Sequence, residues 1–245
     1  MKSTDFYKLL VQKFPHQPTQ VQDVVLQKIS EFLVSSNSED LFLLKGYAGT
    51  GKTTIISTVV NHLWELKKKA VLMAPTGRAA KVISNYSGKE AFTIHKKIYF
   101  PKAQKGGGVT FSLQPNKHRD TFFIVDEASM IGDSTSESKL FENGSLLDDL
   151  MQYVYSGYGC KLILIGDTAQ LPPVKMELSP ALDEQTLSNY YNKEVIAIEL
   201  NEVVRQKEES GILHNATLLR QTLENGFYED FKFNLQNFKD IIKPE

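Results

Sequence analysis

Short apolar runs alternate along the chain with segments in which apolar residues recur at helical spacing. A first run of strand length, LFLLK, ends at Gly46, and further runs follow at 70–74, 122–125, 161–165 and 195–200. Segments of helical periodicity separate these runs, near 53–66, 76–86 and 145–156. Strands that are apolar throughout and are separated by helices are typical of a parallel sheet with both faces covered. The pattern therefore predicts an α/β fold with a parallel sheet and helices on both faces.

The flanking segments add helices and one insertion. Two amphipathic helices are predicted before the first strand, one closed by Pro15 and one over Thr19–Leu33, and another helix is predicted from about Ser210. Residues 99–120 are basic and Gly-rich and contain the alternating segment VTFSL, which favours a small β-hairpin. Residues 132–145 are polar and predict an exposed loop. We expect one α/β domain with a small insertion and a C-terminal extension.

Composition and charge exclude several classes of protein. The 245 residues include 28 Lys+Arg and 29 Asp+Glu, so the net charge of −1 gives no general indication of nucleic-acid binding, and any basic surface is local. A single cysteine, Cys160, excludes an internal disulfide framework and a cysteine cluster for zinc. No apolar run approaches the ~18 residues that span a membrane, and the N-terminus lacks a signal-peptide core. We expect a cytoplasmic protein without a membrane partner.

The clearest chemical motif is GYAGTGKT, Gly46 to Thr53, which fits G-x-x-x-x-G-K-[ST]. It lies between a predicted strand and a predicted helix, as a phosphate-binding loop requires. Glycines let successive backbone N–H groups turn towards a phosphate at the helix N-terminus. Lys52 would supply positive charge to the β- and γ-phosphates, and Thr53 a hydroxyl to Mg²⁺. The alternative is a Gly-rich turn before a helix.

Two further strand ends carry polar residues. In FFIVDEASM, Asp126 and Glu127 follow a buried strand; Asp126 would hold Mg²⁺ through water and Glu127 would activate the attacking water. Two acids that cap the next helix are the alternative. In LILIGDTAQLPPV, Gln170 follows a strand in a loop stiffened by two prolines, where an amide would reach the γ-phosphate. A plain strand-to-turn connection explains that segment equally well.

Taken in order, these segments resemble the first motor domain of a superfamily 1 helicase of the RecD/Dda-like branch. PTQVQDVV resembles the Q motif, GYAGTGKT motif I, APTGRAAKVI motif Ia, and TIHK the next DNA-contacting segment. FFIVDEASM resembles motif II and IGDTAQLPPV motif III, while IELNEVVRQ resembles the segment with the γ-phosphate arginine and SGILHNATLLR the helix after it. The resemblance runs through about 200 residues, and the order and spacing of the motifs carry it. It implies a P-loop NTPase fold of the RecA-like kind.

The resemblance implies ATP and Mg²⁺ as cofactors. Gln22 would read adenine, although Thr19 and Gln22 also form a T-x-x-Q capping box, and both roles are compatible. Arg205 would stabilise charge on the transferred phosphoryl group, or is a solvent-exposed arginine after a strand. Thr53 and Asp126 would hold the metal. The nucleotide-binding residues would be Gln22, Gly46, Ala48, Gly49, Thr50, Gly51, Lys52, Thr53 and Thr54.

The resemblance also implies single-stranded DNA as a partner. Pro75, Thr76 and Arg78 would lie near its path, although Thr76 would also serve simply to cap a helix. His95 would contact DNA or fill a structural position. Residues 97–120 correspond to the pin insertion of related helicases, in which Phe111 would stack on a base or pack the insertion onto the domain.

The expected organisation is a motor domain over 1–205, including the pin insertion, and an extension over 206–245. The expected activity is that of an ATP-dependent DNA helicase moving 5′→3′, in processes such as DNA repair and recombination. Nothing after Gln206 resembles the motifs of a second motor domain, so we expect this chain alone to bind nucleotide weakly and not to unwind DNA. The alternatives are a non-catalytic nucleotide- and nucleic-acid-binding module and a small-molecule P-loop kinase.

Overall fold

A computed structural model describes residues 1–103, 109–132, 145–202, 210–224, 231–235, 238, 240 and 241. Apart from its first and last residues, the polar loop expected at 132–145 lies outside the described residues, as does Arg205. The chain divides into two compact units, Met1–Asn201 and Glu202–Glu245.

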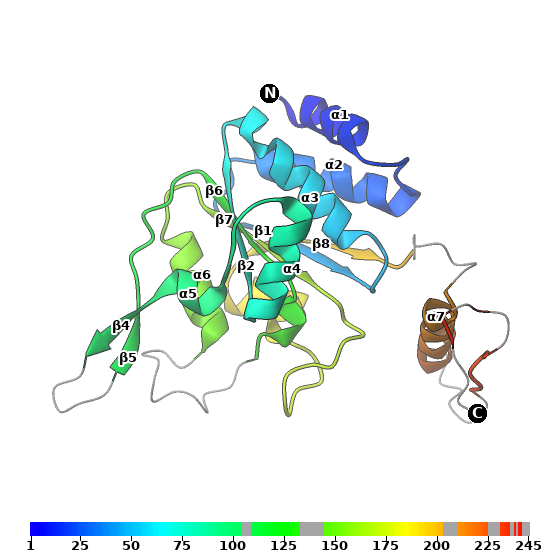
Figure 1. Ribbon diagram of the computed structural model, residues 1–245. Coiled ribbons are helices and arrows are strands. Elements are labelled where there is room, and N and C mark those ends of the chain that lie inside the picture. Colours follow the sequence, from blue (N-terminus) through cyan, green and yellow to red (C-terminus); the bar gives the residue numbers. More distant parts are fainter. Residues whose placement is uncertain are drawn as a thin grey trace. The chain divides into compact units, whose positions relative to one another are not determined.

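A six-stranded parallel sheet forms the centre of the first unit (Figure 1). Its strands, in the spatial order β3-β2-β6-β7-β1-β8, are β3 (Ala91–Thr93), β2 (Lys69–Ala74), β6 (Thr121–Val125), β7 (Lys161–Gly166), β1 (Asp40–Gly46) and β8 (Glu194–Leu200). Every neighbouring pair is parallel. The predicted parallel α/β sheet is confirmed. The three-residue edge strand β3 was not predicted.

Helices cover both faces of this sheet. They are α1 (Ser3–Lys13), α2 (Gln20–Val34), α3 (Lys52–His62), which continues into the 3-10 turn η1 (Leu63–Leu66), α4 (Gly77–Ser87), α5 (Ile94–Ile98) and α6 (Leu146–Tyr155). The described residues of this unit also form the 3-10 turns η2 (Ala128–Met130) and η4 (Pro180–Leu182) and the short π-helix η5 (Thr186–Tyr190). Figure 1 shows α1, α2 and α3 on one side of the sheet and α5 and α6 on the other.

Alternate residues of each strand enter two separate hydrophobic cores. Phe42 and Leu44 of β1 pack with α1, α2 and α3 in one core. Leu41 and Leu43, one position along, pack with α5, α6 and η2 in the other. Because successive side chains of a strand point to opposite faces, a strand buried on both faces reads as a continuous apolar run. The apolar runs that predicted the strands therefore arise because each strand contributes side chains to both cores.

The insertion is an antiparallel hairpin of β4 (Tyr99–Ala103) and β5 (Val109–Leu113), as expected from VTFSL. It projects beyond α5 in Figure 1. At its base, the buried Tyr99 hydroxyl donates a 2.5 Å hydrogen bond to the carboxylate of Asp149 in α6. Phe111 packs against the core on the α5 and α6 side, where it is partly buried. Phe111 thus packs onto the domain in the structure, and its stacking on a base stays a prediction.

A buried ion pair closes the amino-terminal edge of the sheet. The ammonium of Lys161 in β7 lies 3.1 Å from the carboxylate of Asp40 in β1, and the two side chains are only 6% and 8% exposed. Lys161 also donates to the carbonyl oxygen of Ser35 at 2.9 Å, and the Asn37 amide donates to Asp40 at 2.9 Å. This network joins β1, β7 and the end of α2, at the edge opposite to the phosphate loop.

The second unit contains α7 (Gly211–Glu224), which agrees with the helix predicted from about Ser210. The carboxylate of Asp240 accepts hydrogen bonds from the Ser210 hydroxyl and from the backbone N–H groups of Gly211 and Ile212, at 2.7, 2.7 and 3.3 Å. These are the otherwise unpaired donors of a helix N-terminus, so Asp240 caps the helix from a distant part of the chain.

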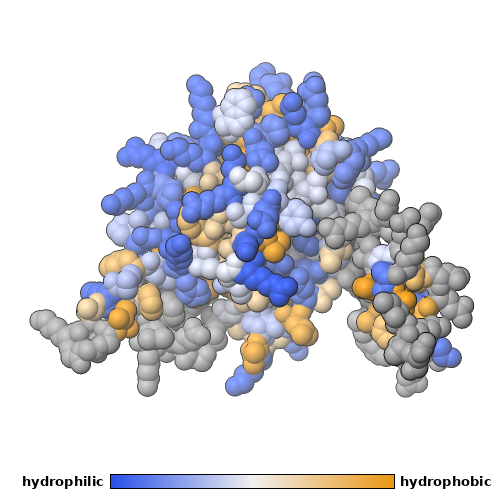
Figure 2. Space-filling view, viewed as in Figure 1, coloured by the Kyte–Doolittle hydropathy of each residue, from blue (hydrophilic) through white to orange (hydrophobic). Residues whose placement is uncertain are grey.

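The face of the molecule seen in Figure 2 is mainly hydrophilic with scattered hydrophobic side chains. Within the described part of the chain, no helix combines the length and apolar character needed to cross a membrane.

Candidate nucleotide-binding site

The candidate residues follow three neighbouring strands. The GYAGTGKT loop follows β1, Asp126 and Glu127 follow β6, and Gln170 follows β7, which lies between the other two strands. Because these strands are parallel, their carboxyl ends meet at one edge of the sheet, which is where open α/β sheets bind ligands. The strand order therefore brings three sequence-distant motifs together.

The phosphate loop has the backbone conformation that its glycines permit. Gly49 and Gly51 have φ angles of 82° and 92°, in the left-handed region that other residues rarely adopt. A β-carbon at Gly46 would lie 2.8 Å from both the β-carbon and the carbonyl oxygen of Leu200 in β8. The ammonium of Lys52 donates to the carbonyl oxygens of Gly46 and Tyr47. The Lys52 side chain, at the start of α3, therefore folds back onto the loop in which a phosphate would bind.

Gln22 supports this loop from α2. Its side-chain oxygen accepts from the backbone N–H of Thr19 at 3.1 Å, and the N–H of Gln22 donates to the Thr19 hydroxyl at 3.3 Å, which is the predicted capping box. The side-chain nitrogen donates to the carbonyl oxygen of Thr50 at 3.0 Å. Gln22 is fully buried. The structure thus contains the capping role and an unforeseen contact with the phosphate loop, while adenine recognition stays a prediction.

Asp126 and Glu127 lie at the end of β6 in an unusual environment. Burial, reinforced by the neighbouring Glu127 carboxylate, raises the pKa of Asp126 to about 6, and the backbone N–H of Glu127 and the Lys52 ammonium partly oppose this shift. Glu127 has a φ of 56°, which is uncommon outside glycine. Such backbone conformations concentrate at functional sites. A nearby cation would favour the ionised form of such a carboxylate.

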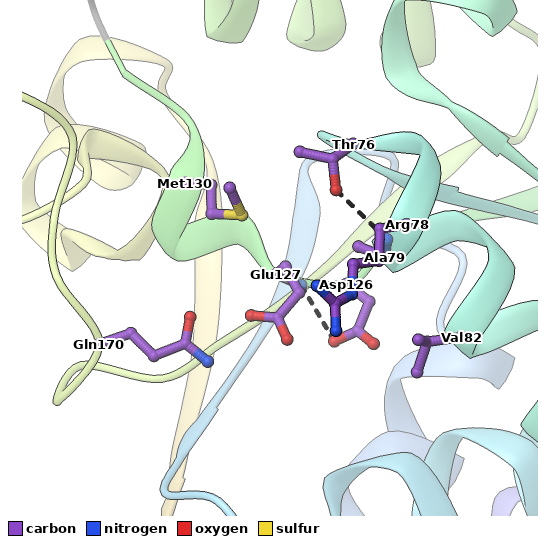
Figure 3. A pocket seen from close by; sticks show the side chains of 8 residues that line it. All are labelled: Thr76, Arg78, Ala79, Val82, Asp126, Glu127, Met130 and Gln170. Carbon is purple, nitrogen blue, oxygen red and sulfur yellow. Dashed lines mark hydrogen bonds between the residues drawn. The ribbon is translucent and has the colours of Figure 1, made fainter.

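A pocket of about 290 Å³ opens beside the two acids (Figure 3). Gln170 and Met130 line one side, and the residues of the α4 region line the other. In Figure 3 the Glu127 carboxylate and the Gln170 carboxamide point towards one another across the pocket. The full lining is Thr76, Arg78, Ala79, Val82, Asp126, Glu127, Met130 and Gln170.

Two of the five DNA-contact candidates, Thr76 and Arg78, lie in this same pocket. The Thr76 hydroxyl also accepts from the N–H of Ala79 at 3.2 Å, so it caps α4, as the alternative reading held. Pro75, just before that cap, is half-buried. His95 lies in α5 with its ring 5.7 Å from that of Tyr99. His95 and Phe111 do not line the pocket.

The remaining nucleotide-binding candidates lie in the phosphate loop and the first turn of α3. Ala48 is exposed, Thr50 is fully buried, and Thr53 and Thr54 are half-buried in the first turn of α3. The Thr53 hydroxyl and the Asp126 carboxylate are oxygen donors of the kind that Mg²⁺ prefers. In the described ranges no cluster of three or more His, Cys, Asp or Glu side chains is arranged to hold a metal. Proteins commonly hold Mg²⁺ through one or two side chains plus substrate phosphates.

One residue of the site was missed by sequence reasoning. The hydroxyl of Ser129, in η2, donates to the side-chain oxygen of Gln170 at 3.2 Å. Ser129 is buried, at 2% exposure. The only sequence signal was its place three residues after Asp126, which by itself does not indicate a contact with a loop 41 residues further on.

The fold and the site define a P-loop NTPase of the RecA-like kind. Residues 27–230 match the AAA domain family, and the chain belongs to that family. Its relatives identify it as a motor domain of the superfamily 1, RecD/Dda-like branch.

Two curated relatives and one solved structure illustrate this. The ATP-dependent RecD2 DNA helicase of Deinococcus radiodurans is 34% identical over 135 residues, which are 55% of this chain and 16% of the relative. The ATP-dependent DNA helicase dda of Enterobacteria phage T4 is 31% identical over 166 residues, 66% of this chain and 34% of the relative. The Pif1 helicase from Candida albicans has the same fold, with a TM-score of 0.51 and 20% identity over 86% of this chain and 45% of that one.

The chain thus spans about a sixth of RecD2 and a third of the dda helicase.

Proposed function

We propose that this chain is the ATP-binding motor domain of an ATP-dependent DNA helicase, which couples ATP hydrolysis to movement along single-stranded DNA. One observation carries the proposal: the GYAGTGKT loop, the Asp126–Glu127 pair and Gln170 occupy the carboxyl ends of adjacent parallel strands. A small-molecule kinase would need the first of these alone. The names of the relatives, which are DNA helicases, support the same class.

Nucleotide binding begins at the phosphate loop. Backbone N–H groups between Gly46 and Thr53 would surround the β-phosphate, and the helix dipole of α3 would favour its negative charge. The Lys52 ammonium would exchange its two loop carbonyl partners for phosphate oxygens. Thr53 and Asp126 would hold Mg²⁺, which when bound neutralises phosphate charge and polarises the phosphoryl group.

Hydrolysis would use the residues beside the pocket. Glu127 would accept a proton from the attacking water, and Gln170 opposite would donate its amide N–H to the γ-phosphate or to that water. Arg205, which follows β8, would stabilise charge on the transferred phosphoryl group. Residues 203–209 lie outside the described residues, so this role rests on the resemblance.

Coupling to DNA would pass through the α4 region. Thr76 and Arg78 line the same pocket as Asp126 and Glu127, so a DNA phosphate held near the start of α4 lies next to the catalytic carboxylates. Movement in the 5′→3′ direction follows from the resemblance. We expect no duplex unwinding by this chain alone.

Calorimetry with ATP and Mg²⁺ tests the proposal on this chain and on Lys52→Ala. We expect the parent to bind ATP only with Mg²⁺, and Lys52→Ala to bind at least ~10-fold more weakly, because a charge-assisted contact with phosphate is lost. Lys28→Ala, at an exposed position of α2, is the matched control. Equal binding by the parent and Lys52→Ala would contradict the proposed phosphate site.

Filter binding with single-stranded DNA then separates the alternatives. We expect the amount of DNA retained to change between ADP and a triphosphate analogue. A small-molecule kinase would retain no DNA. A non-catalytic module would retain DNA to the same extent with either nucleotide.

A further inference from the structure

Two serine hydroxyls form hydrogen bonds between the loop after β7 and the η2 turn after β6. At the start of the loop, the Ser129 hydroxyl donates to the side-chain oxygen of Gln170 at 3.2 Å. At its end, the Ser179 hydroxyl lies 2.9 and 2.6 Å from the carbonyl oxygens of Ala128 and Ile131. Both serines are buried, at 2% and 1% exposure. Both ends of this loop are therefore held by the η2 turn that follows the two catalytic carboxylates.

The loop between these two points has little other support. Leu171 and Val174 are 91% and 87% exposed. Asp167 fixes the backbone at the start of the loop through two hydrogen bonds. Its carbonyl oxygen accepts from the backbone N–H of Gln170 at 3.2 Å, and its carboxylate accepts from the backbone N–H of Ala169 at 2.9 Å. The backbone position of Gln170 is thus defined independently of its side chain.

The Gln170 side chain itself has three rotatable bonds and is exposed. In the part of the chain that the structure describes, its carboxamide has one hydrogen-bond partner, the Ser129 hydroxyl. A glutamine on the surface otherwise samples many rotamers. The contact with Ser129 thus selects the rotamer in which the carboxamide faces Glu127 across the pocket (Figure 3).

We propose that Ser129 is a positioning residue that presents the Gln170 amide to the γ-phosphate. The Ser129 hydroxyl occupies the carboxamide oxygen, and this leaves the two amide N–H donors for the pocket that Asp126 and Glu127 share. A γ-phosphate oxygen accepts hydrogen bonds only, so this orientation of the carboxamide suits it. The inference rests on the proposed function and deepens it, because it concerns how the same site distinguishes a triphosphate from a diphosphate.

Gly166 shows how closely the two segments approach. A β-carbon at this last residue of β7 would lie 3.1 Å from the backbone nitrogen of Ser129 and closer still to the side chain of Leu182. The absence of a side chain at Gly166 therefore lets η2 pack against the end of β7, and this close approach brings Ser129 within hydrogen-bond distance of Gln170.

The experiment compares the binding of ATPγS and ADP, each with Mg²⁺, by the parent chain, Ser129→Ala, Gln170→Ala and the double variant. We expect Ser129→Ala to weaken ATPγS binding about 3-fold to 10-fold and to leave ADP binding unchanged, because one hydrogen bond that orients the amide is lost. The double variant should bind ATPγS no more weakly than Gln170→Ala, since Ser129 acts through Gln170. Ser129→Thr, which keeps a hydroxyl, should restore discrimination.

Ser30→Ala is the matched control, because it removes a buried hydroxyl that bonds to the Leu26 carbonyl oxygen in α2, away from the site. Thermal melting of every variant identifies any that fail to fold. If Ser129→Thr does not fold, the cycle of Ser129→Ala and Gln170→Ala still decides the question.

Three results would overturn the inference: equal losses for ATPγS and ADP in Ser129→Ala, additive losses in the double variant, or a parent that does not distinguish the two nucleotides. A different set of results would contradict the proposed function itself. In that case the parent binds neither nucleotide, or Lys52→Ala binds both as well as the parent does.

Discussion

The side-chain nitrogen of Gln22 donates a hydrogen bond to the carbonyl oxygen of Thr50, so that α2 holds the phosphate loop from behind. The two residues are 28 positions apart, and both are fully buried. Gly51, the next residue of the loop, has a φ of 92° and lies so close that a β-carbon there would overlap the Gln22 side-chain nitrogen. The shape of the phosphate loop therefore depends on the side chain of Gln22 as well as on the glycines.

Replacing Gly51 with alanine should damage both the fold and the site. A left-handed backbone costs an L-residue roughly 1–2 kcal/mol, and the added methyl group must also displace the Gln22 amide. We expect urea denaturation to show a loss of about 2–3 kcal/mol in the free energy of unfolding, together with weaker ATP binding. Gly77→Ala is the control, since a β-carbon there meets nothing within 4 Å. A Gly51→Ala protein as stable as the parent would contradict this account.

Gln22→Ala separates support of the loop from recognition of adenine. The variant loses the capping-box contact with Thr19 and the hydrogen bond to Thr50, so the free energy of unfolding should fall by about 1–3 kcal/mol. If Gln22 only supports the loop, the affinities for ATP and GTP fall by the same factor. If it reads adenine, the preference for ATP over GTP is lost. Gln27→Ala, at an exposed position of the same helix, should change neither quantity.

Lys161→Met should be strongly destabilising. It leaves the Asp40 carboxylate, which is 8% exposed, without its ammonium partner. Removing one member of a buried ion pair typically costs about 3–5 kcal/mol, and we expect urea denaturation to give a value in that range. The double variant Lys161→Met, Asp40→Leu removes both charges and should be less destabilised than the sum of the two single variants. Lys28→Met, in an exposed pair, should cost under about 1 kcal/mol. Additive single-variant losses would contradict a coupled pair.

Stability should fall as the pH drops below the ordinary histidine pKa of 6.5, in part because of His118. Burial, with the neighbouring positive charges of Lys97 and Lys69, lowers the pKa of His118 in the folded protein. The unfolded chain then binds a proton at a pH where the folded protein does not, so acid favours unfolding until the lower folded pKa is passed.

His118→Gln tests this by urea denaturation at pH 7.5 and pH 5.5. The variant loses the edge-on contact of the His118 ring with Phe123, whose centroids are 5.3 Å apart, at both pH values. The loss of stability between the two pH values should nevertheless be smaller than in the parent. His16→Gln, at an exposed position, serves as the control. An identical pH dependence in the parent and His118→Gln would show that His118 does not contribute.

Much of the fold could be predicted from local sequence, because a strand that is buried on both faces is a continuous run of apolar residues. Strand β6 appears as an apolar run, and α4 as a helix with a cap at Thr76. The β4–β5 hairpin was visible in the alternation of VTFSL. The edge strand β3 and the five-residue helix α5 were not predicted, because elements so short span fewer than two periods of either pattern.

The sequence by itself determined the longer elements, their parallel arrangement and the phosphate loop, because each follows from residues adjacent in the chain. Tertiary structure decided which side chains meet: Gln22 with Thr50, Ser129 with Gln170, and Lys161 with Asp40. Periodicity states which face of an element is buried but not which element lies beside it. The position of β7 between β6 and β1 is set by burial summed over the whole sheet, and that strand order places Gln170 beside Ser129.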